Sequence, residues 1–395
     1  MKRVFIIILF SLSALNAGYV DDTLAVRYIL DRNGRTDLPV TRVTDTVEGR
    51  VTDLYLSQAG LTVIDDTIGT LSFLMTLSID HNQIAALPPA VGRCTELRIL
   101  KASNNNLVSL PDELSRCKRL VRCDVDNNKI AALPSSFSGL GRLETFSLRN
   151  NQLRYITREF NGLTGLRYLY ADNNLITAID ERIDSLLSLE VLSLRNNRLT
   201  SFPAGVCRFS KLRKIDLSEN RLRGIPEQIG DLESLTDFYL SGNRIEKLPV
   251  TIEGAHELQW LYLDNNDLAV LPAEITLLAK LQWLSLSGNR LQSLPDSIGS
   301  LTALSVLAVS RNLIDTLPTS ITALSGLRIL RIDGNRLATL PEKITNLQNL
   351  SFKRGNETIG TLSIEGNRLC SLPEQLAAWA DAYCSGWREK QNCTK

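Results

Sequence analysis

Hydrophobic positions recur along this chain in one fixed frame. In one representative stretch, Leu281, Leu284, Leu286 and Leu291 are separated by variable residues, and Asn289 stands between the last two leucines. The complete unit reads LxxLxLxxNxLxxLPxxIxxL. The central LxL of the unit alternates apolar and variable positions, which predicts a short strand. The later apolar positions are three or four residues apart, which predicts that the chain returns in another conformation.

The asparagine of this unit recurs every 23 residues without interruption. Its members are Asn82, Asn105, Asn128, Asn151, Asn174, Asn197, Asn220, Asn243, Asn266, Asn289, Asn312 and Asn335. A fixed period of this length indicates a repeat protein, in which each unit buries its apolar face only by stacking on its neighbours. We therefore expect one continuous solenoid core.

The side chains of one unit predict its local structure. Leu284 and Leu286 point to the same face of a strand, and strands of successive units pair in parallel. The asparagine amide carries donors and an acceptor, so it can satisfy backbone groups where the chain leaves the strand. Proline disfavours α-helix in the residue before it, which predicts an extended or short 3₁₀ return segment.

The pattern resembles the leucine-rich repeats of the 23-residue LPxxI type over about Val51 to Leu372. The resemblance implies an α/β fold: a horseshoe-shaped solenoid with a parallel concave β-sheet and about 14 repeats. It further implies recognition of a partner, usually through the concave sheet, and it carries over no catalytic residues and no cofactor.

The two ends of the repeat array depart from the frame. Ala59 takes the asparagine position one period before Asn82, as expected of a terminal repeat. Before it, Asp22 to Leu30 predicts a cap helix that stops at Asn33-Gly34. The expected segments are a signal peptide over 1–17, an N-terminal cap over 18–50, the repeat array over 51–372 and a helical C-terminal cap over 373–395.

The N-terminus has the features of an export signal. Lys2 and Arg3 precede an apolar run from Val4 to about Leu15, which ends in small or polar residues. The run is shorter than the roughly 20 residues that span a bilayer, and no later segment reaches that length without charges. We expect a protein without a membrane span that is secreted, periplasmic or held at the cell surface.

One insertion interrupts the period near the C-terminus. Asn367 continues the asparagine ladder, but it follows Asn335 by 32 residues rather than 23. The excess lies near 353–361 and predicts a surface loop. Two interpretations stay open: a loop that contacts a ligand, or a tolerated excursion.

Cysteine spacing leaves the disulfide pairing open. Cys94 and Cys117 occupy the same repeat position, so they could meet between adjacent coils in an oxidising compartment. In the C-terminal cap, Cys370, Cys384 and Cys393 could form one disulfide.

Aromatic residues gather at the outward positions of the predicted strands. They are Tyr168, Tyr170, Tyr239, Trp260, Tyr262 and Trp283. The last four fall on three consecutive strands, which lie about 4.8 Å apart in a sheet, so they predict one exposed patch. Trp and Tyr are frequent binding anchors, which favours a partner site. The alternative is that neighbouring rings only stabilise the sheet by cross-strand pairing.

Arginine recurs one position after the ladder asparagine and predicts a basic rim. The rim comprises Arg198, Arg221, Arg244, Arg290, Arg336 and Arg368. It could bind an acidic peptide or an acidic glycan. Alternatively, Asp264, Asp333 and Glu365 pair with these arginines locally, at a gain of only about 0 to 1 kcal/mol per exposed pair.

Composition and motifs exclude several classes of function. The chain has 44 basic and 43 acidic side chains, and this balance gives no reason to expect a nucleic-acid partner. It lacks HExxH, GxSxG and GxxxxGK[ST], and His81 and His256 lie far apart, so neither catalysis nor a metal site is indicated. We expect a non-catalytic module that binds a protein partner, with a glycan or cell-wall component as the alternative.

Overall fold

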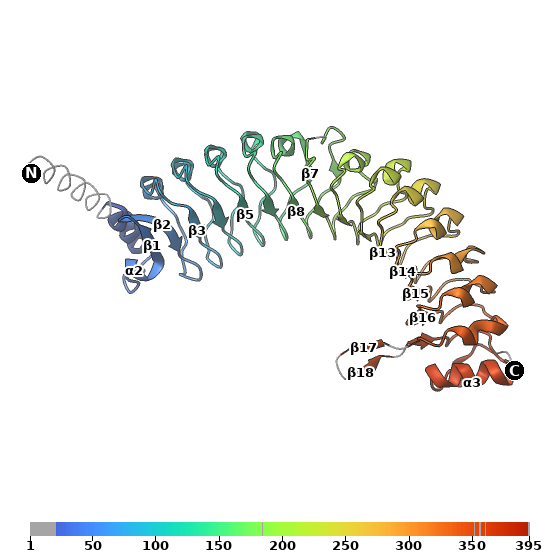
Figure 1. The fold of residues 1–395 in the computed structure, drawn as a ribbon. Helices are drawn as coiled ribbons and strands as arrows, with labels where there is room; N and C mark the ends of the chain where they lie inside the picture. Colours follow the sequence, from blue (N-terminus) through green and yellow to red (C-terminus); the bar gives the residue numbers. More distant parts are fainter. Residues whose placement is uncertain (1–20, 184, 351, 355–356, 360, 394–395) are drawn as a thin grey trace, which may run out of the picture. The chain divides into compact units, whose positions relative to one another are not determined.

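The computed structural model describes residues 21–183, 185–350, 352–354, 357–359 and 361–393, without the side chains of 351–360. The expected signal peptide at 1–17 therefore lies outside the described residues. The chain divides into two compact units, Met1–Leu194 and Arg195–Lys395. Each unit is a solenoid of leucine-rich coils, with short strands on one side and 3₁₀ segments on the other (Figure 1).

Unit Met1–Leu194 begins with a helix over 21–32 and then forms a sheet that is parallel from β2 onward. Its first segments are α2 (Val40–Val43), β1 (Thr44–Val47) and β2 (Arg50–Tyr55). The repeat strands that follow are β3 (Thr76–Ser78), β4 (Ile99–Lys101), β5 (Arg122–Asp124), β6 (Thr145–Ser147), β8 (Tyr168–Tyr170) and β10 (Val191–Ser193). A separate parallel pair, β7 (Tyr155–Ile156) and β9 (Ala178–Ile179), lies outside this sheet.

Unit Arg195–Lys395 continues the same construction. Its parallel strands are β11 (Lys214–Asp216), β12 (Asp237–Tyr239), β13 (Trp260–Tyr262), β14 (Trp283–Ser285), β15 (Val306–Ala308), β16 (Ile329–Arg331) and β19 (Leu362–Ser363). Each strand pairs with the next in unshifted register, so Trp260 lies beside Trp283 and Tyr262 beside Ser285. Equivalent residues of successive repeats therefore form straight columns.

The return segments are short 3₁₀ helices, as the recurring proline predicted. In the first unit they are η1 (Asp66–Thr70), η2 (Pro89–Arg93), η3 (Asp112–Arg116), η4 (Ser135–Gly139) and η5 (Arg158–Gly162). In the second unit they are η6 (Ala204–Arg208), η7 (Glu227–Asp231), η8 (Val250–Gly254), η9 (Ala273–Leu277), η10 (Ile298–Ser300), η11 (Thr319–Ala323) and η12 (Glu342–Asn346). Proline with extended φ and ψ precedes most of them, for example Pro272 before η9, because its ring fixes φ and leaves no amide to satisfy.

The asparagine column is buried and bonds to the backbone of two coils at once. Asn289 is typical: its Nδ2 donates to the carbonyl oxygens of Leu263 and Leu286, each at 2.9 Å. Its Oδ1 accepts from the backbone amide of Leu268 at 3.0 Å. Asn367 makes the same contacts across the insertion, with Ile332, Ile364 and Leu337 as partners. The bonds hold neighbouring coils together where strand pairing ends.

The residue before each ladder asparagine bends the chain through a left-handed conformation. Asn104 and Asn127 have φ of 57° and 56°, and Gly242 has φ of 71°. Asn and Gly accept this region at little cost. Glu219 and Arg311 occupy the same place with φ of 56° and 54°, although neither type favours it.

The insertion forms a two-stranded hairpin instead of an open loop. Strand β17 (Phe352–Arg354) pairs antiparallel with β18 (Glu357–Ile359), with Phe352 opposite Ile359. In Figure 1 the hairpin projects away from the 3₁₀ side of its unit. The hairpin strands pair with each other and not with the repeat sheet. The next repeat strand, β19, therefore pairs directly with β16, and the insertion does not disturb the order of the repeats.

Both ends of the array are closed by capping elements. At the N-terminus, Asp22 is buried at the start of β2, where its carboxylate accepts from Arg50 Nε and from the amide of Val51, each at 2.9 Å. At the C-terminus, α3 (Glu374–Tyr383) packs Leu376, Trp379 and other apolar residues inward, and η13 (Arg388–Lys390) follows. No helix among the described residues is long and apolar enough to cross a membrane.

The cysteines divide into one disulfide and five thiols. Cys370 pairs with Cys393, with Cα atoms 5.8 Å apart, and Cys384 is a free, buried thiol. Cys94 and Cys117 do not form the disulfide that their shared repeat position suggested. Each thiol instead donates to a backbone carbonyl of the preceding coil, Ile68 at 3.2 Å and Val91 at 3.6 Å.

Candidate functional site on the strand face

The strand face of the second unit is built from two columns of outward side chains. Each three-residue strand buries its middle residue and turns the first and third outward. The first column runs Lys214, Asp237, Trp260, Trp283, Val306 and Ile329. The second column runs Asp216, Tyr239, Tyr262, Ser285, Ala308 and Arg331. The expected aromatic residues therefore lie side by side on β12, β13 and β14.

Three of these rings form a continuous aromatic stack, which we define as Tyr239, Tyr262 and Trp283. The ring centroids of Tyr239 and Tyr262 are 4.9 Å apart, with the planes 12° from parallel. Those of Tyr262 and Trp283 are 5.6 Å apart at 30°. Trp260 lies on β13 beside Trp283, and all four residues are half-buried. The rings hold one another in place, so the surface is pre-arranged for contact with an apolar group.

Charged neighbours hold the end of the stack at Tyr239. Lys214 Nζ lies 4.7 Å from the Tyr239 ring centroid, within the range of a cation–π contact. The Tyr239 hydroxyl donates to Asp237 Oδ1 at 3.1 Å. Burial, followed by the nearby Asp237 carboxylate, raises the pKa of Tyr239 above its usual value. Burial likewise raises the pKa of Tyr262. Both phenols therefore remain neutral hydrogen-bonding groups at physiological pH.

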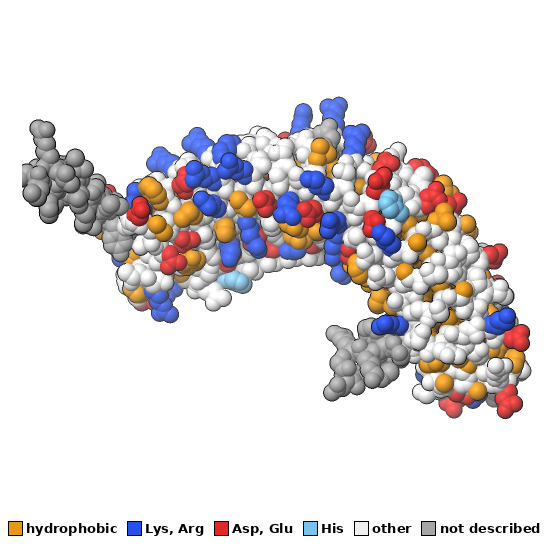
Figure 2. Space-filling view, viewed as in Figure 1, with side chains coloured by type: hydrophobic (Ala, Val, Ile, Leu, Met, Phe, Trp, Pro, Cys, Tyr) orange, Lys and Arg blue, Asp and Glu red, His pale blue; other side chains and the backbone are white. Residues whose placement is uncertain are grey.

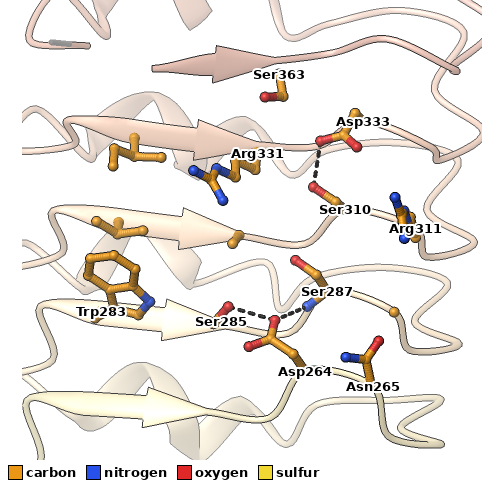
Figure 3. Close-up of a pocket in the computed structure, with 14 residues that line it drawn as sticks. Asp264, Asn265, Trp283, Ser285, Ser287, Ser310, Arg311, Arg331, Asp333 and Ser363 are labelled. Carbon is orange, nitrogen blue, oxygen red and sulfur yellow. Dashed lines mark hydrogen bonds between the residues drawn. The ribbon is translucent and has the colours of Figure 1, made fainter. Parts of the chain in front are cut away.

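A hollow of about 470 Å³ opens next to Trp283. It lies over β14, β15, β16 and β19, where the second column changes from large rings to Ser285, Ala308 and Arg331 (Figure 3). Val306 and Ile329 of the first column line it as well. Small side chains leave this space empty, while Trp283 forms its aromatic edge.

The carboxylates of the hollow already have partners, whereas its arginines form no ion pair with the described residues. Asp264 Oδ1 accepts from the Ser285 hydroxyl at 2.6 Å and from the Ser287 amide at 2.8 Å. Asp333 Oδ1 accepts from the Ser310 hydroxyl at 2.5 Å. Among the described residues, Arg311 and Arg331 make no ion pair. The hollow thus combines an apolar edge with hydrogen-bonding groups of both kinds.

Tyr168 and Tyr170 lie on β8 of the other unit in a different environment. The Arg149 guanidinium lies 4.0 Å from the Tyr170 ring centroid and also bonds Asp172 at 3.0 Å. The Arg167 guanidinium lies 5.2 Å from the Tyr168 ring, and the Tyr168 hydroxyl donates to Glu190 at 3.2 Å. Both tyrosines therefore belong to a network of ion pairs rather than to an open apolar surface.

The rim arginines are exposed and largely without ionic partners. Arg290 pairs with Asp267 at 2.6 Å. No other rim arginine forms an ion pair within the described ranges. The described residues show no ion pair between a rim arginine and Asp264, Asp333 or Glu365: serine hydroxyls bind the first two carboxylates, and Lys390 lies 3.7 Å from Glu365.

The part of the chain that the structure describes contains no group of three or more His, Cys, Asp or Glu side chains placed to hold a metal ion. His81 approaches Asn104 Nδ2 at 3.3 Å, and His256 Nδ1 lies 2.9 Å from the carbonyl of Gly254.

Sequence reasoning located the rings but missed the hollow. Ser285, Ala308 and Ser363 give no sequence signal of a cavity, because serine and alanine are common at outward strand positions whether or not a hollow lies above them. The change from rings to small residues along one column was nevertheless visible in the sequence. The unshifted strand register places the small residues directly after the rings.

Three family models match the chain, over five stretches in all. The model described as "Leucine rich repeat" matches residues 118–176, 187–245 and 210–268. The model "Leucine-rich repeat region" matches 273–362, and "Leucine Rich repeats (2 copies)" matches 164–206. No curated protein matches the chain.

Several solved structures are also similar to this chain. A leucine-rich-repeat protein of Leptospira interrogans is 30% identical, with a TM-score of 0.74, and the match covers 85% of this chain and 82% of that one. The plant peptide hormone receptor RGFR1, in complex with RGF2, is 30% identical with a TM-score of 0.62 over 78% of this chain and 54% of the receptor. An internalin of Listeria monocytogenes shares the fold at 19% identity, with a TM-score of 0.62 over 96% and 97% of the two chains.

Proposed function

The chain belongs to the leucine-rich-repeat family, and from this premise we propose that it is an exported, non-catalytic recognition module of the 23-residue LPxxI type. It binds a protein partner on the strand face of Arg195–Lys395. The aromatic stack and Trp260 anchor the partner, and the adjoining hollow receives part of it.

The aromatic stack lies at the edge of an unfilled hollow, and this arrangement is the main support for a partner site here. Half-buried Trp and Tyr rings contribute large contact area at a small loss of side-chain freedom, and such residues dominate binding hot spots. The hollow supplies concave space next to these rings. A partner could therefore bury an apolar group against the rings and form hydrogen bonds inside the hollow at the same time.

The neighbours support a polypeptide as the partner. The receptor RGFR1 is solved in complex with RGF2, and the ectodomain of the receptor kinase GASSHO1/SCHENGEN3 of Arabidopsis thaliana in complex with CASPARIAN STRIP INTEGRITY FACTOR 2. Export is supported by the N-terminal sequence, where basic residues precede a short apolar run.

A glycan or cell-wall component is the second candidate. Asp264 and Asn265 lie at the hollow together with Trp283, and flat rings beside amide and carboxylate groups suit the apolar faces and hydroxyls of sugars.

The test is a pull-down from cell-envelope and extracellular extracts with the mature chain and two variants. The first variant replaces Trp260, Tyr262 and Trp283 with Ala. The control replaces Tyr55 and Tyr155 with Ala, since both are exposed aromatic residues in the other unit. We expect the intact chain and the control to retain one protein, and the first variant to lose it.

Equal capture by all three chains would refute the aromatic anchor. The extract is also treated with glycosidase, which removes glycans but leaves its proteins intact. If this treatment abolishes capture, the glycan candidate is favoured instead. Sequencing the N-terminus of the exported chain tests the signal peptide, for which cleavage before Gly18 is expected.

A further inference from the structure

A second candidate site lies in unit Met1–Leu194, away from the strand face. Arg98, Arg119, Arg142 and Val121 line a hollow of about 270 Å³ at the residues that precede the strands. Arg119 and Arg142 occupy the same position in successive repeats, 23 residues apart. The amide of Val121 donates to the carbonyl of Arg98 at 2.8 Å, so these two residues also lie on adjacent coils. Three arginine side chains therefore line one small hollow together with Val121.

The surrounding surface carries further cations. Arg93 and Arg116 end η2 and η3, and Lys118 lies between Arg116 and Arg119 in sequence. Figure 2 shows Lys and Arg side chains gathered over the repeats that Figure 1 draws in blue and teal. We define the arginine cluster as Arg93, Arg98, Arg116, Lys118, Arg119 and Arg142.

Little within the protein neutralises this cluster. Arg119 pairs with Glu96. Lys118 Nζ donates to the backbone carbonyl of Gly139 at 2.9 Å, which is a neutral partner. The other four cations form no ion pair with any described residue. Exposed like charges on adjacent coils repel one another, so the cluster favours an external anion.

The chemistry of the cluster selects the kind of anion. Guanidinium groups present paired N–H donors that match the oxygens of sulfate, phosphate and carboxylate groups. Successive coils repeat about every 4.8 Å, so a ligand with anionic groups at regular intervals could contact several arginines in turn. A single small anion would use only the hollow around Val121.

The residues around the arginine cluster distinguish three sources of anionic groups: single-stranded nucleic acid, an anionic membrane and a polysaccharide. Single-stranded nucleic acid is bound by cations together with aromatic rings on which bases stack, and the arginine cluster contains no ring. An anionic membrane surface is usually met by basic residues beside apolar side chains that insert, and Val121 is only half-exposed within its hollow. A linear polysaccharide needs neither feature.

We propose that the arginine cluster binds a linear anionic polysaccharide that carries sulfate or carboxylate groups. This site is separate from the partner site of the strand face and could hold the protein at a polysaccharide-coated surface. The net charge of +1 does not reveal this site, because it sums the whole chain, whereas the cluster is local and lies in coils that also carry Glu96, Asp112 and Glu113.

The test measures binding of a heparin dodecasaccharide to the full mature chain at several NaCl concentrations. The test variant is Arg98→Gln with Arg142→Gln, whose side chains are exposed and make no ion pair among the described residues. The control is Arg208→Gln with Arg328→Gln. Both control arginines are exposed in the other unit, Arg208 at the repeat position of Arg93 and Arg328 at that of Arg98. The two variants lose the same charge.

We expect the test variant to bind about tenfold more weakly, with the slope of log K against log salt reduced by about one for each lost contact. The control should stay within about twofold of the intact chain. Heparin that has lost its sulfate groups and has its carboxylates reduced to alcohols should fail to bind.

Equal weakening of both variants would overturn the site, because net charge alone would then explain binding. Undiminished binding of heparin that lacks both its sulfate and its carboxylate groups would overturn the role of the anionic groups. Tighter binding of phosphatidylserine vesicles or of single-stranded DNA than of heparin would overturn the assignment to a polysaccharide.

Discussion

Tyr239 and Tyr262 stack face to face across two adjacent strands, with ring centroids 4.9 Å apart and planes 12° from parallel. Strand register alone places the two Cα atoms opposite each other, but the parallel rings require both side chains to lean the same way. Trp283 extends the contact to a third strand. The stack can serve stability, partner binding or both, and these roles are separable by experiment.

The stability role predicts a measurable coupling between the two tyrosines. In a double-mutant cycle of Tyr239→Ala and Tyr262→Ala, we expect an interaction energy of about 0.5 to 1.5 kcal/mol in urea unfolding. A coupling near zero would show that the stack contributes nothing to folding and would leave binding as its only role. The control cycle pairs Tyr55→Ala with Tyr262→Ala, two residues without mutual contact, and should give no coupling.

The asparagine ladder predicts a stability loss that depends on burial. Asn289→Ala removes a buried side chain and leaves the amide of Leu268 and the carbonyls of Leu263 and Leu286 without their partner. We expect the free energy of unfolding to fall by about 1 to 3 kcal/mol. Arg290→Ala, at the exposed neighbouring position, should change it by less than about 0.5 kcal/mol. Similar values for both variants would contradict the bonding role of the ladder.

Backbone strain predicts a stabilising substitution. Glu219 has φ of 56° at the position where most repeats carry Asn or Gly. Because the left-handed region costs an ordinary residue about 1 to 2 kcal/mol and Asn less, Glu219→Asn should raise the free energy of unfolding by up to about 1 kcal/mol. Thermal and urea unfolding measure the change. A destabilised Glu219→Asn variant would show that the Glu219 side chain stabilises the coil more than its backbone strains it.

The cysteine assignments predict a thiol count. Without reductant, the denatured mature chain should titrate five thiols, and the folded chain almost none, because all five are buried. Seven thiols would exclude the disulfide between Cys370 and Cys393. Three thiols would indicate a second disulfide, for which Cys94 and Cys117 are the candidates.

Buried thiols also predict loss of stability at alkaline pH. Burial raises the pKa of Cys94 to about 12 and that of Cys117 to about 11, above the ordinary value of 9.0. The folded state therefore holds these protons longer than the unfolded state. Their stabilising effect is complete below pH 9 and is lost as the pH rises toward the folded-state values.

The free energy of unfolding should accordingly decline from pH 9 to pH 11. Cys94→Ala with Cys117→Ala should decline less steeply over the same range, whatever its stability at pH 7. Parallel pH profiles for the two chains would refute the raised pKa values.

Much of the fold could be predicted from the sequence because each repeat obeys local rules. The alternation at Leu284 and Leu286 predicts a strand, and the proline before each return segment predicts 3₁₀ or extended backbone. The cap helix expected from Asp22 to Leu30 lies within the observed helix over 21–32, and α3 lies where the C-terminal helix was expected. Stacking then follows from the period alone, since no single coil can bury its own leucines.

Contacts between coils could not be predicted in the same way. The sequence left the pairing of three C-terminal cysteines open, and the folded cap selects Cys370 with Cys393. It also offered a disulfide between Cys94 and Cys117, whereas both thiols donate to the coil before them. These choices depend on side-chain direction within a packed core, about which a shared repeat position says nothing.

The sequence by itself determined the repeat, the strand register and the residues that face outward, because a 23-residue period fixes all three. Only the tertiary structure decided what those outward residues form together. It assembles Tyr239, Tyr262 and Trp283 into one stack, and it places small residues where a hollow remains. It also joins Arg98, Arg119 and Arg142 around Val121. The physical reason is that periodicity sets positions along the chain, whereas surfaces arise from rotamers and packing between coils.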